Sequence, residues 1–333
     1  MDTGSILAET NIQSEQMRIE GEQKRKGLTG STLKLVAIVA MLIDHFAAII
    51  LDRYLIAAGF LDITEPAQLY QPENKPLLMI YMIDMVMRLI GRLGFPIFCF
   101  LLIEGFGYTR SKVKYASRLA LFALLSEVPF DLAFQNQLLE FTYQNVFFTL
   151  LIGMLTIWGI DILWKRIDGK IKGKGGSILL FVGIAAVTAV GMLCAELLRT
   201  DYAAVGVGTI VVMFLARRNY KAWLVVMLAV AVESILQYYG PGKLVGWILG
   251  GTLFVVLLAI FLTVAKKSGN GRTMAAGCGV LTIAMPIEFT SFITVPLVAA
   301  YNGKRGLKLK YVFYLFYPLH ILLLYLVCFI MGI

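Results

Sequence analysis

The stretch LKLVAIVAMLIDHFAAIIL (residues 33–51) is apolar except for Lys34 and the adjacent pair Asp44 and His45. About 20 mainly apolar residues are enough for an α-helix to cross the hydrocarbon core of a bilayer. An ionisable side chain is costly at that depth and marks a functional site by default. Imidazole is also the side chain best suited to moving protons near neutral pH. The stretch therefore predicts a transmembrane helix with proton-handling chemistry inside the membrane.

The rest of the chain repeats this apolar pattern. Of its 333 residues, 59% are hydrophobic and only 15% are charged, a composition unlike that of a soluble globular domain. We therefore expect an all-α polytopic integral membrane protein with about 10–11 transmembrane helices of roughly 20 residues. The spans are expected at residues 33–51, 78–107, 115–134, 146–164, 177–198, 202–217, 220–238, 244–265, 274–285, 289–301 and 309–331.

Three parts of this scheme need separate treatment. The span 78–107 is too long for one crossing, so we expect a tilted or amphipathic piece over Leu77–Leu93 and a second helix after Pro96. The segments 274–285 and 289–301 are short, which favours a helical hairpin or a re-entrant pair. Residues 1–32 are polar and are predicted to be a mobile or amphipathic cytoplasmic arm, with the transmembrane domain at 33–333.

The basic residues indicate the orientation in the membrane. Twenty-four of the thirty lysines and arginines fall on alternate connections between spans. Basic residues concentrate in cytoplasmic loops, so we assign the N-terminus to the cytoplasm. This bias, attracted by anionic lipid headgroups, accounts for most of the net charge of +9. No nucleic-acid partner is therefore expected. The four cysteines lie inside apolar segments without paired spacing, so neither a disulfide framework nor a metal site is expected.

Lys34 and His45 are eleven residues apart, which returns to nearly the same helix face and separates them by about 16 Å along the axis. Lys34 would lie at the cytoplasmic boundary and His45 well inside the bilayer. This geometry suits a long ligand with an anionic head and a reactive tail, such as acetyl-CoA. Alternatively, Lys34 extends to the interface from a purely structural position, and His45 donates a hydrogen bond to another helix.

Further charged side chains lie inside predicted spans. In MIDMVMRLIGRLGFPIF, Asp84, Arg88 and Arg92 follow one another at intervals of four residues on one helix face. An Asp84–Arg88 pair would stabilise the helix by itself, whereas the excess guanidinium charge favours phosphate binding, with Arg92 the better candidate. The basic turn that contains Lys304 and Arg305 is a second candidate phosphate contact.

Glu127 and Asp131 share a face around Pro129 and can raise one another's pKa. They are predicted either to pair with the buried arginines or to bind a cationic acceptor substrate. His320 lies in YVFYLFYPLHILLLY, two residues after Pro318. It is either a second candidate for catalysis or a bridge to a neighbouring helix.

Several of these motifs, in this order, resemble the TraX family, which includes an F-pilin N-terminal acetylase. The matching stretches are LKLVAIVAMLIDHFAAI (33–49), RLIGRLGFPIFCFLLIEGF (88–106), SRLALFALLSEVPFDLAF (117–134), QNVFFTLLIGML (144–155), ELLRTDYAAVGV (196–207), YNGKRG (301–306) and FYLFYPLHILLL (313–324). The basic residue, ten-residue gap and histidine on the first helix are also similar to those of the wider transmembrane acyltransferases.

The resemblance implies an acetyltransferase of the bacterial inner membrane that uses acetyl-CoA, with His45 as general base or acetyl carrier. Asp44 is a further catalytic candidate that would act through a neighbouring helix, and His320 is the catalytic candidate if His45 is not used. The implied acceptor is a pilin-like N-terminal amine or a glycan hydroxyl or amine, and the sequence does not separate these. A proton-coupled secondary transporter is the competing class, because ionisable residues inside spans also mark ion pathways. Transporter halves with matching broken helices are not evident in the sequence.

Overall fold

The computed structural model describes residues 27–63, 65–167, 174–218, 268–307 and 310–333. The predicted spans 220–238 and 244–265 and most of the predicted arm lie outside these residues. The elements are α2 (Gly30–Phe46), the π-helix η1 (Ala47–Leu51), α3 (Asp52–Ala57), η2 (Phe60–Asp62), η3 (Pro66–Tyr70), α4 (Lys75–Gly91), α5 (Gly94–Tyr108), α6 (Lys112–Phe134), α7 (Val146–Ile167), α8 (Lys174–Leu197), α9 (Ala203–Arg217), α12 (Gly269–Ala284), η4 (Pro286–Ile293), α13 (Thr294–Ala299) and α14 (Lys310–Met331).

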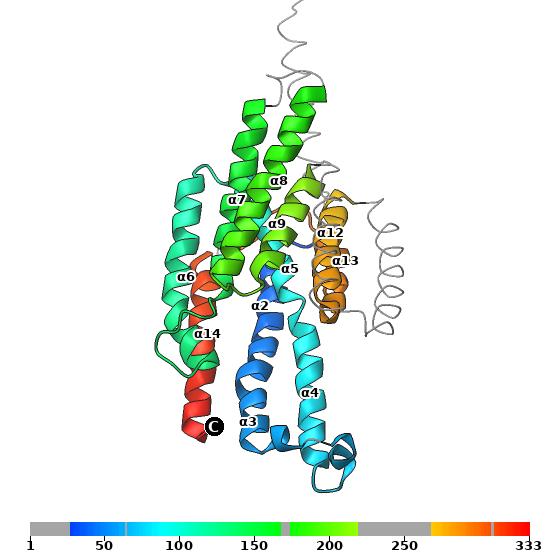
Figure 1. Ribbon diagram of the computed structural model, residues 1–333, viewed down its shortest axis with the longest axis vertical. Coiled ribbons are helices and arrows are strands. Elements are labelled where there is room, and N and C mark those ends of the chain that lie inside the picture. The colour runs from blue at the N-terminus through cyan, green and yellow to red at the C-terminus, as the bar shows by residue number, and fades with distance from the viewer. Residues whose placement is uncertain (1–26, 64, 168–173, 219–267, 308–309) are drawn as a thin grey trace, which may run out of the picture.

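Five helical segments of the described residues are long and apolar enough to cross a membrane: Gly30–Ala57, Lys75–Tyr108, Val146–Ile167, Gly175–Leu197 and Tyr311–Met331. They run roughly along the long axis of the molecule (Figure 1). In a bilayer, backbone polar groups must be satisfied within the segment, which helices achieve. The predicted all-α polytopic membrane fold is confirmed.

The long predicted span 78–107 is two helices, as expected, but the break lies at Arg92 and Leu93 rather than at Pro96. Pro96 instead lies in the first turn of α5, where a missing N–H costs least. The carbonyl of Leu89, near the end of α4, accepts a hydrogen bond of 2.8 Å from the hydroxyl of Thr290. Side-chain donors of this kind satisfy the carbonyls that a helix end leaves without partners.

The short pair near the C-terminus is separated at Met285, before Pro286, as the sequence predicts. α12 has 16 residues, η4 has 8 and α13 has 6. At about 1.5 Å per residue for the two α-helices and about 2.0 Å for the 3₁₀-helix η4, none of these helices reaches across a hydrocarbon core of about 30 Å. This geometry matches the predicted hairpin or re-entrant pair.

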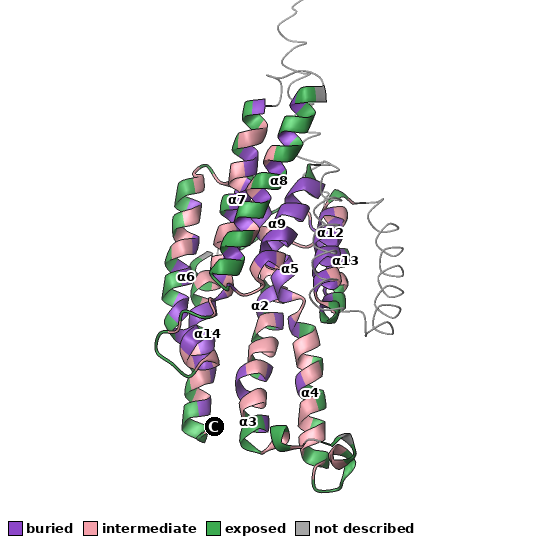
Figure 2. Cartoon of the chain, in the orientation of Figure 1, coloured by how far each residue is buried: buried purple, intermediate pink, exposed green. Residues whose placement is uncertain are grey.

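The most buried helices are α9 and α12, which pack against one another (Figure 2). Gly277 of α12 makes this possible, because a Cβ there would overlap the side chain of Met213 on α9. By contrast, α4, α6, α8 and α14 expose large apolar side chains on their outer faces. Apolar outer faces of this kind suit contact with lipid tails.

The basic connections lie at one end of the bundle and the C-terminus at the other (Figure 1). The first turn of α2 joins the basic end through the loop 301–306. The backbone N–H groups of Gly30 and Ser31 donate to the carbonyls of Lys304 and Arg305 at 2.8 and 3.0 Å. Thr29, the N-cap, accepts from the N–H of Thr32. The helix thus begins three residues earlier than the predicted span, and the loop fixes its first turn.

Candidate functional site

A cavity of about 720 Å³ lies between α2, α5, α6, α7, α14 and the connections that precede α9 and α14. At the basic end of the bundle its lining includes Lys34, Arg118 and the exposed residues Arg110 and Arg305. At the other end the lining includes Asp44 and His45. Since Lys34 and His45 lie on one helix, these two ends are about 16 Å apart.

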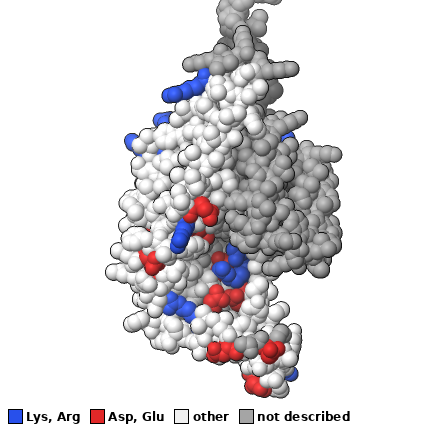
Figure 3. Space-filling view, viewed as in Figure 1, with Lys and Arg blue, Asp and Glu red and all other residues white. Residues whose placement is uncertain are grey.

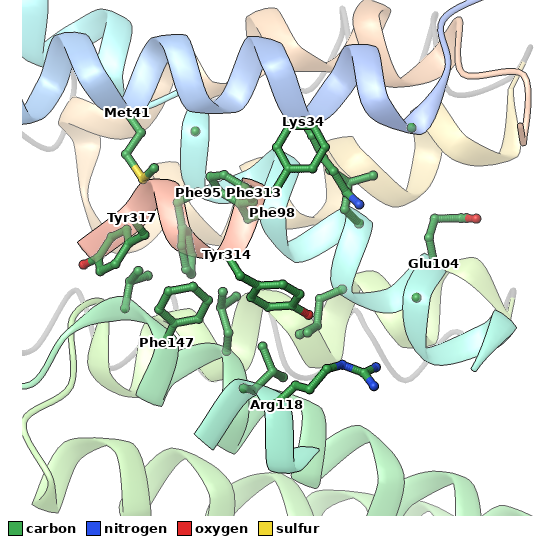
Figure 4. Close-up of a pocket in the computed structure, with 18 of the residues that line it drawn as sticks. Lys34, Met41, Phe95, Phe98, Glu104, Arg118, Phe147, Phe313, Tyr314 and Tyr317 are labelled. Carbon is green, nitrogen blue, oxygen red and sulfur yellow. The ribbon is translucent and has the colours of Figure 1, made fainter. Parts of the chain in front are cut away.

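Aromatic side chains form the wall between the two ends: Phe95, Phe98, Phe147, Phe313, Tyr314 and Tyr317. In Figure 4, Phe95, Phe98, Phe313 and Tyr314 lie between Met41 and Tyr317 on one side and Glu104 on the other. The ammonium of Lys34 lies 5.2 Å from the ring centroid of Phe313. Cation–π contact of this kind orients a long flexible side chain. The cavity therefore has cationic side chains at the basic end of the bundle and an apolar wall along its length.

The two histidines meet, although 275 residues separate them. Nδ1 of His45 lies 2.7 Å from Nε2 of His320, and Nδ1 of His320 lies 2.6 Å from the carbonyl oxygen of Phe316. The His45 ring also makes edge contacts with Phe134 and Tyr317, with centroids 5.8 and 5.9 Å away. His320 is 5% exposed and does not line the cavity, but it contacts His45, which does.

Asp44 points away from His45, as their positions about 100° apart on a helix predict. Its carboxylate pairs with Arg88 of α4 at 3.0 Å. Arg88 therefore bonds across to α2 rather than to Asp84, the partner that helical spacing suggests. The reason is Gly91, whose missing side chain leaves room for Asp44 against α4. Charged side chains of both signs gather over α2 and α4 in Figure 3.

The π-helix η1 begins two residues after His45. A π-helical turn contains one more residue than an α-helical turn. Asp44 and Asp52, eight residues apart, would lie about 80° apart on an uninterrupted α-helix. One extra residue turns the later part back by about 100° and brings the two carboxylates to within about 20°. Arg88 interacts electrostatically with both. Such π-turns are frequent at functional sites.

Of the residues predicted to bind the donor, Lys34 and Arg305 line the cavity, whereas Arg88, Arg92 and Lys304 do not. Arg92 pairs with the fully buried Glu288 of η4 at 3.1 Å. Its guanidinium is thus already matched by a carboxylate, which lies between the two short predicted segments 274–285 and 289–301. The donor-binding role of these three residues stays a prediction without a contact in this cavity.

The predicted acceptor residues, Glu127 and Asp131, are buried outside the cavity lining. Glu127 accepts a hydrogen bond from the amide of Asn145, and Asp131 accepts one of 2.8 Å from the N–H of Glu140. Neither forms an ion pair with an arginine among the residues described. The oxygen of Asn145 caps α7 by accepting from Phe147 at 3.0 Å. These contacts hold α6 against α7; substrate binding by either carboxylate remains a prediction.

The sequence analysis missed four lining residues. Arg110 and Arg118 were counted only as markers of orientation. Asp201 and Tyr202 lie in the short connection before α9, at the inner end of the cavity. Tyr202 has a φ of 61°, which is strained for a bulky residue, and its ring stacks on Phe95 with centroids 3.8 Å apart. The sequence signal for Asp201 was its carboxylate in a short connection between two apolar spans.

Asp201 is held by a hydrogen bond of 2.8 Å from the hydroxyl of Tyr143. Its backbone N–H donates to the carbonyl of Gln144, also at 2.8 Å. Within the described part of the chain, no group of three or more His, Cys, Asp or Glu side chains could hold a metal ion. The inner end of the cavity thus offers imidazole, carboxylate and phenol groups for chemistry.

Comparison with known proteins identifies related sequences. A family model described as TraX protein matches residues 29–328. A curated relative from Dichelobacter nodosus, "Probable fimbrial assembly protein FimC, serogroup H1", is 26% identical over 305 residues, which cover 88% of this chain and 92% of the relative. No solved structure matches.

Proposed function

The chain belongs to the TraX family, and we propose that it is an integral membrane acetyltransferase that uses cytoplasmic acetyl-CoA. The observation that carries the proposal is the cavity that connects four cationic side chains to His45. The proposal also assigns the basic end of the bundle to the cytoplasm of a bacterial inner membrane, following the distribution of basic residues.

The chemistry of the lining matches the three parts of acetyl-CoA. Lys34, Arg110, Arg118 and Arg305 would bind the phosphates, since cationic donors form strong charge-assisted hydrogen bonds with phosphate oxygens. The aromatic wall would hold the pantetheine arm. The thioester would then lie near His45, because the cavity continues inward along α2 from Lys34.

At the inner end, the imidazole of His45 would take a proton from the acceptor as its nitrogen or oxygen attacks the thioester carbonyl. The carbon–sulfur bond then breaks, and the imidazole returns the proton to the sulfur of coenzyme A. In an alternative route, His45 attacks first and carries the acetyl group to the acceptor. Single-turnover labelling with radioactive acetyl-CoA and no acceptor separates the routes, because only the second leaves label on the protein.

The acceptor is proposed to be a pilin-like N-terminal amine or a glycan hydroxyl or amine. The relative's description as a fimbrial assembly protein supports the pilin-related alternative. An amine with a pKa of about 8 is mostly protonated at neutral pH, so transfer to a peptide amine should accelerate as the pH rises from about 6 to 8. A hydroxyl acceptor does not lose a proton in this pH range, so the acceptor itself would cause no such increase in rate.

A thermal-unfolding titration tests the donor. A ligand that binds only the folded state stabilises it by about 2.7 kcal/mol at 100 times its Kd. We expect coenzyme A to raise the unfolding temperature of the detergent-solubilised protein, and pantetheine, which has no phosphate, to have a much smaller effect. No shift with saturating coenzyme A in a folded sample would overturn the proposal and favour the proton-coupled transporter.

A further inference from the structure

Two hydrogen bonds link His45, His320 and the carbonyl of Phe316, and the donor and the acceptor of each can be assigned. The carbonyl of Phe316 can only accept a hydrogen bond, so Nδ1 of His320 must carry the hydrogen. A neutral imidazole has one N–H, which leaves Nε2 of His320 as an acceptor. Nδ1 of His45 must then donate across the 2.7 Å contact. The remaining nitrogen of neutral His45, Nε2, therefore has a free lone pair.

The packing around the two rings maintains this assignment of hydrogen-bond donors and acceptors. The planes of the two imidazoles are parallel to within 2°, and their centroids are 4.9 Å apart although the nitrogens are only 2.7 Å apart. The rings therefore meet edge to edge in nearly one plane, so an N–H of one can point along a lone pair of the other. His320 stacks on the ring of Phe316, with centroids 4.5 Å apart and planes within 13°. Phe316 and His320 are one turn apart on α14, so the helix itself fixes the carbonyl that orients His320. A reversed His320 ring would lose this bond.

We propose that His320 is a positioning residue, which holds His45 in the tautomer whose Nε2 is the catalytic base. The proposal rests on the acetyltransferase function and gives His320 a defined role in it. His320 lies outside the cavity lining and touches no ligand there, so it acts through His45. The orienting partner of a catalytic histidine is usually a carboxylate; here it is a second imidazole anchored to a backbone carbonyl.

The same contact would stabilise the cation that forms during the reaction. When Nε2 of His45 takes a proton from the acceptor, the ring becomes an imidazolium. Its Nδ1–H bond to His320 then becomes charge-assisted, and such bonds are roughly twice as strong as neutral ones. Nε2 later gives the proton to the sulfur of coenzyme A, which restores the starting tautomer. The hydrogens on Nδ1 of His45 and Nδ1 of His320 stay in place throughout.

The chain makes the tautomers directly observable, because His45 and His320 are its only two histidines. Solid-state NMR of protein labelled with ¹⁵N-histidine should show both rings as Nδ1–H tautomers at a pH where both are neutral. This measurement needs no acetyl-CoA. It therefore tests the positioning role even if the acetyltransferase proposal fails. Nε2–H tautomers at both rings of the wild-type protein would overturn the inference.

Two variants at position 320 separate positioning from simple packing. In His320→Gln, the amide oxygen can occupy the place of Nε2 and accept from His45, whereas His320→Leu keeps bulk but offers no acceptor. We expect Leu to lower kcat by roughly 10²–10⁴-fold, the range of general-base catalysis, with the KM for acetyl-CoA nearly unchanged. Gln should recover most of the lost rate and keep the single remaining imidazole as the Nδ1–H tautomer.

The stabilisation of each variant by coenzyme A shows whether it is folded. Equal kcat values for folded His320→Leu and wild type would overturn the positioning role. So would a His320→Gln protein that is folded, keeps the Nδ1–H tautomer at His45 and is as slow as the Leu variant. If His320→Leu does not fold, the tautomer and rate of His320→Gln and the tautomers of the wild type still decide the question.

Discussion

The side chain of Asp44 occupies the space beside Gly91 that a Cβ at position 91 would need. This contact allows Asp44 on α2 to reach Arg88 on α4 at 3.0 Å. The backbone at 91 is helical, so glycine is there for space rather than for an unusual conformation. The close approach of the two helices therefore depends on one missing methyl group.

The first prediction concerns this contact. Gly91→Ala should displace Asp44, separate it from Arg88 and distort the helix that carries His45. We expect a loss of unfolding free energy of about 1–3 kcal/mol, as for other overpacked sites, and a marked loss of acetyl transfer. Gly107→Ala is the matched control, because a Cβ there would meet no atom within 4 Å apart from its chain neighbours and the backbone of its own helix. Equal behaviour of the two variants in unfolding and activity would contradict the account.

The second prediction concerns the donor phosphates. Arg118→Ala and Arg305→Ala should each weaken coenzyme A binding by about 1.5–3 kcal/mol if they lose one charge-assisted hydrogen bond. Lys304→Ala should leave binding almost unchanged, because Lys304 is exposed and outside the cavity lining. Isothermal titration with coenzyme A measures all three. A larger loss for Lys304→Ala than for both arginine variants would move the phosphates to another site.

The third prediction concerns His45. His45→Ala should reduce acetyl transfer by roughly 10²–10⁴-fold while coenzyme A affinity stays near that of the wild type. The physical reason is distance, since the cationic end of the cavity is about 16 Å away along α2. Measuring turnover and coenzyme A binding on the same preparation checks both parts. Near wild-type turnover would remove His45 from the mechanism.

The fourth prediction separates stability from binding at Arg92. Arg92→Ala leaves the carboxylate of Glu288, which is fully buried, without its cation. Breaking a buried pair in this way costs about 3–5 kcal/mol. Lys165→Ala, which removes a largely exposed partner of Asp161, should cost only about 0–1 kcal/mol. Equilibrium unfolding in detergent compares the two, and similar costs would show that the Arg92 pair contributes no more than a surface pair.

Hydropathy predicted much of the fold, because a membrane helix must be apolar over its whole length. The division of the span 78–107 into two helices also followed from the sequence, although the break lies at Arg92 and Leu93 rather than at Pro96. The break between the segments 274–285 and 289–301 lies where the sequence placed it. The pairing of Arg88 with Asp44 did not follow, since helical spacing favours Asp84 and only the packing of α2 on α4 reverses that choice. The π-helix has no signature in the run of alanines and isoleucines that forms it.

Part of the site was also predicted from the apolar pattern of the helices. His45 is identified by its depth in an apolar helix, and Lys34 by its position on the same face. The contact of His45 with His320 spans 275 residues and depends on how α14 packs against α2. Arg110 and Arg118 were not predicted as part of the site, because basic residues at a helix end are explained equally well by membrane orientation.

The π-helix after His45 has a consequence for chain length. Deleting one residue from Ala47–Leu51 would let the segment return to α-helical geometry and would leave the two carboxylates seven residues apart, about 20° short of two full turns. The second carboxylate would therefore stay on the face that Asp44 occupies, still directed toward Arg88. A homologue one residue shorter here can keep both carboxylates on one face, so an alignment gap in this segment marks the loss of the π-turn and not a change in the direction of side chains.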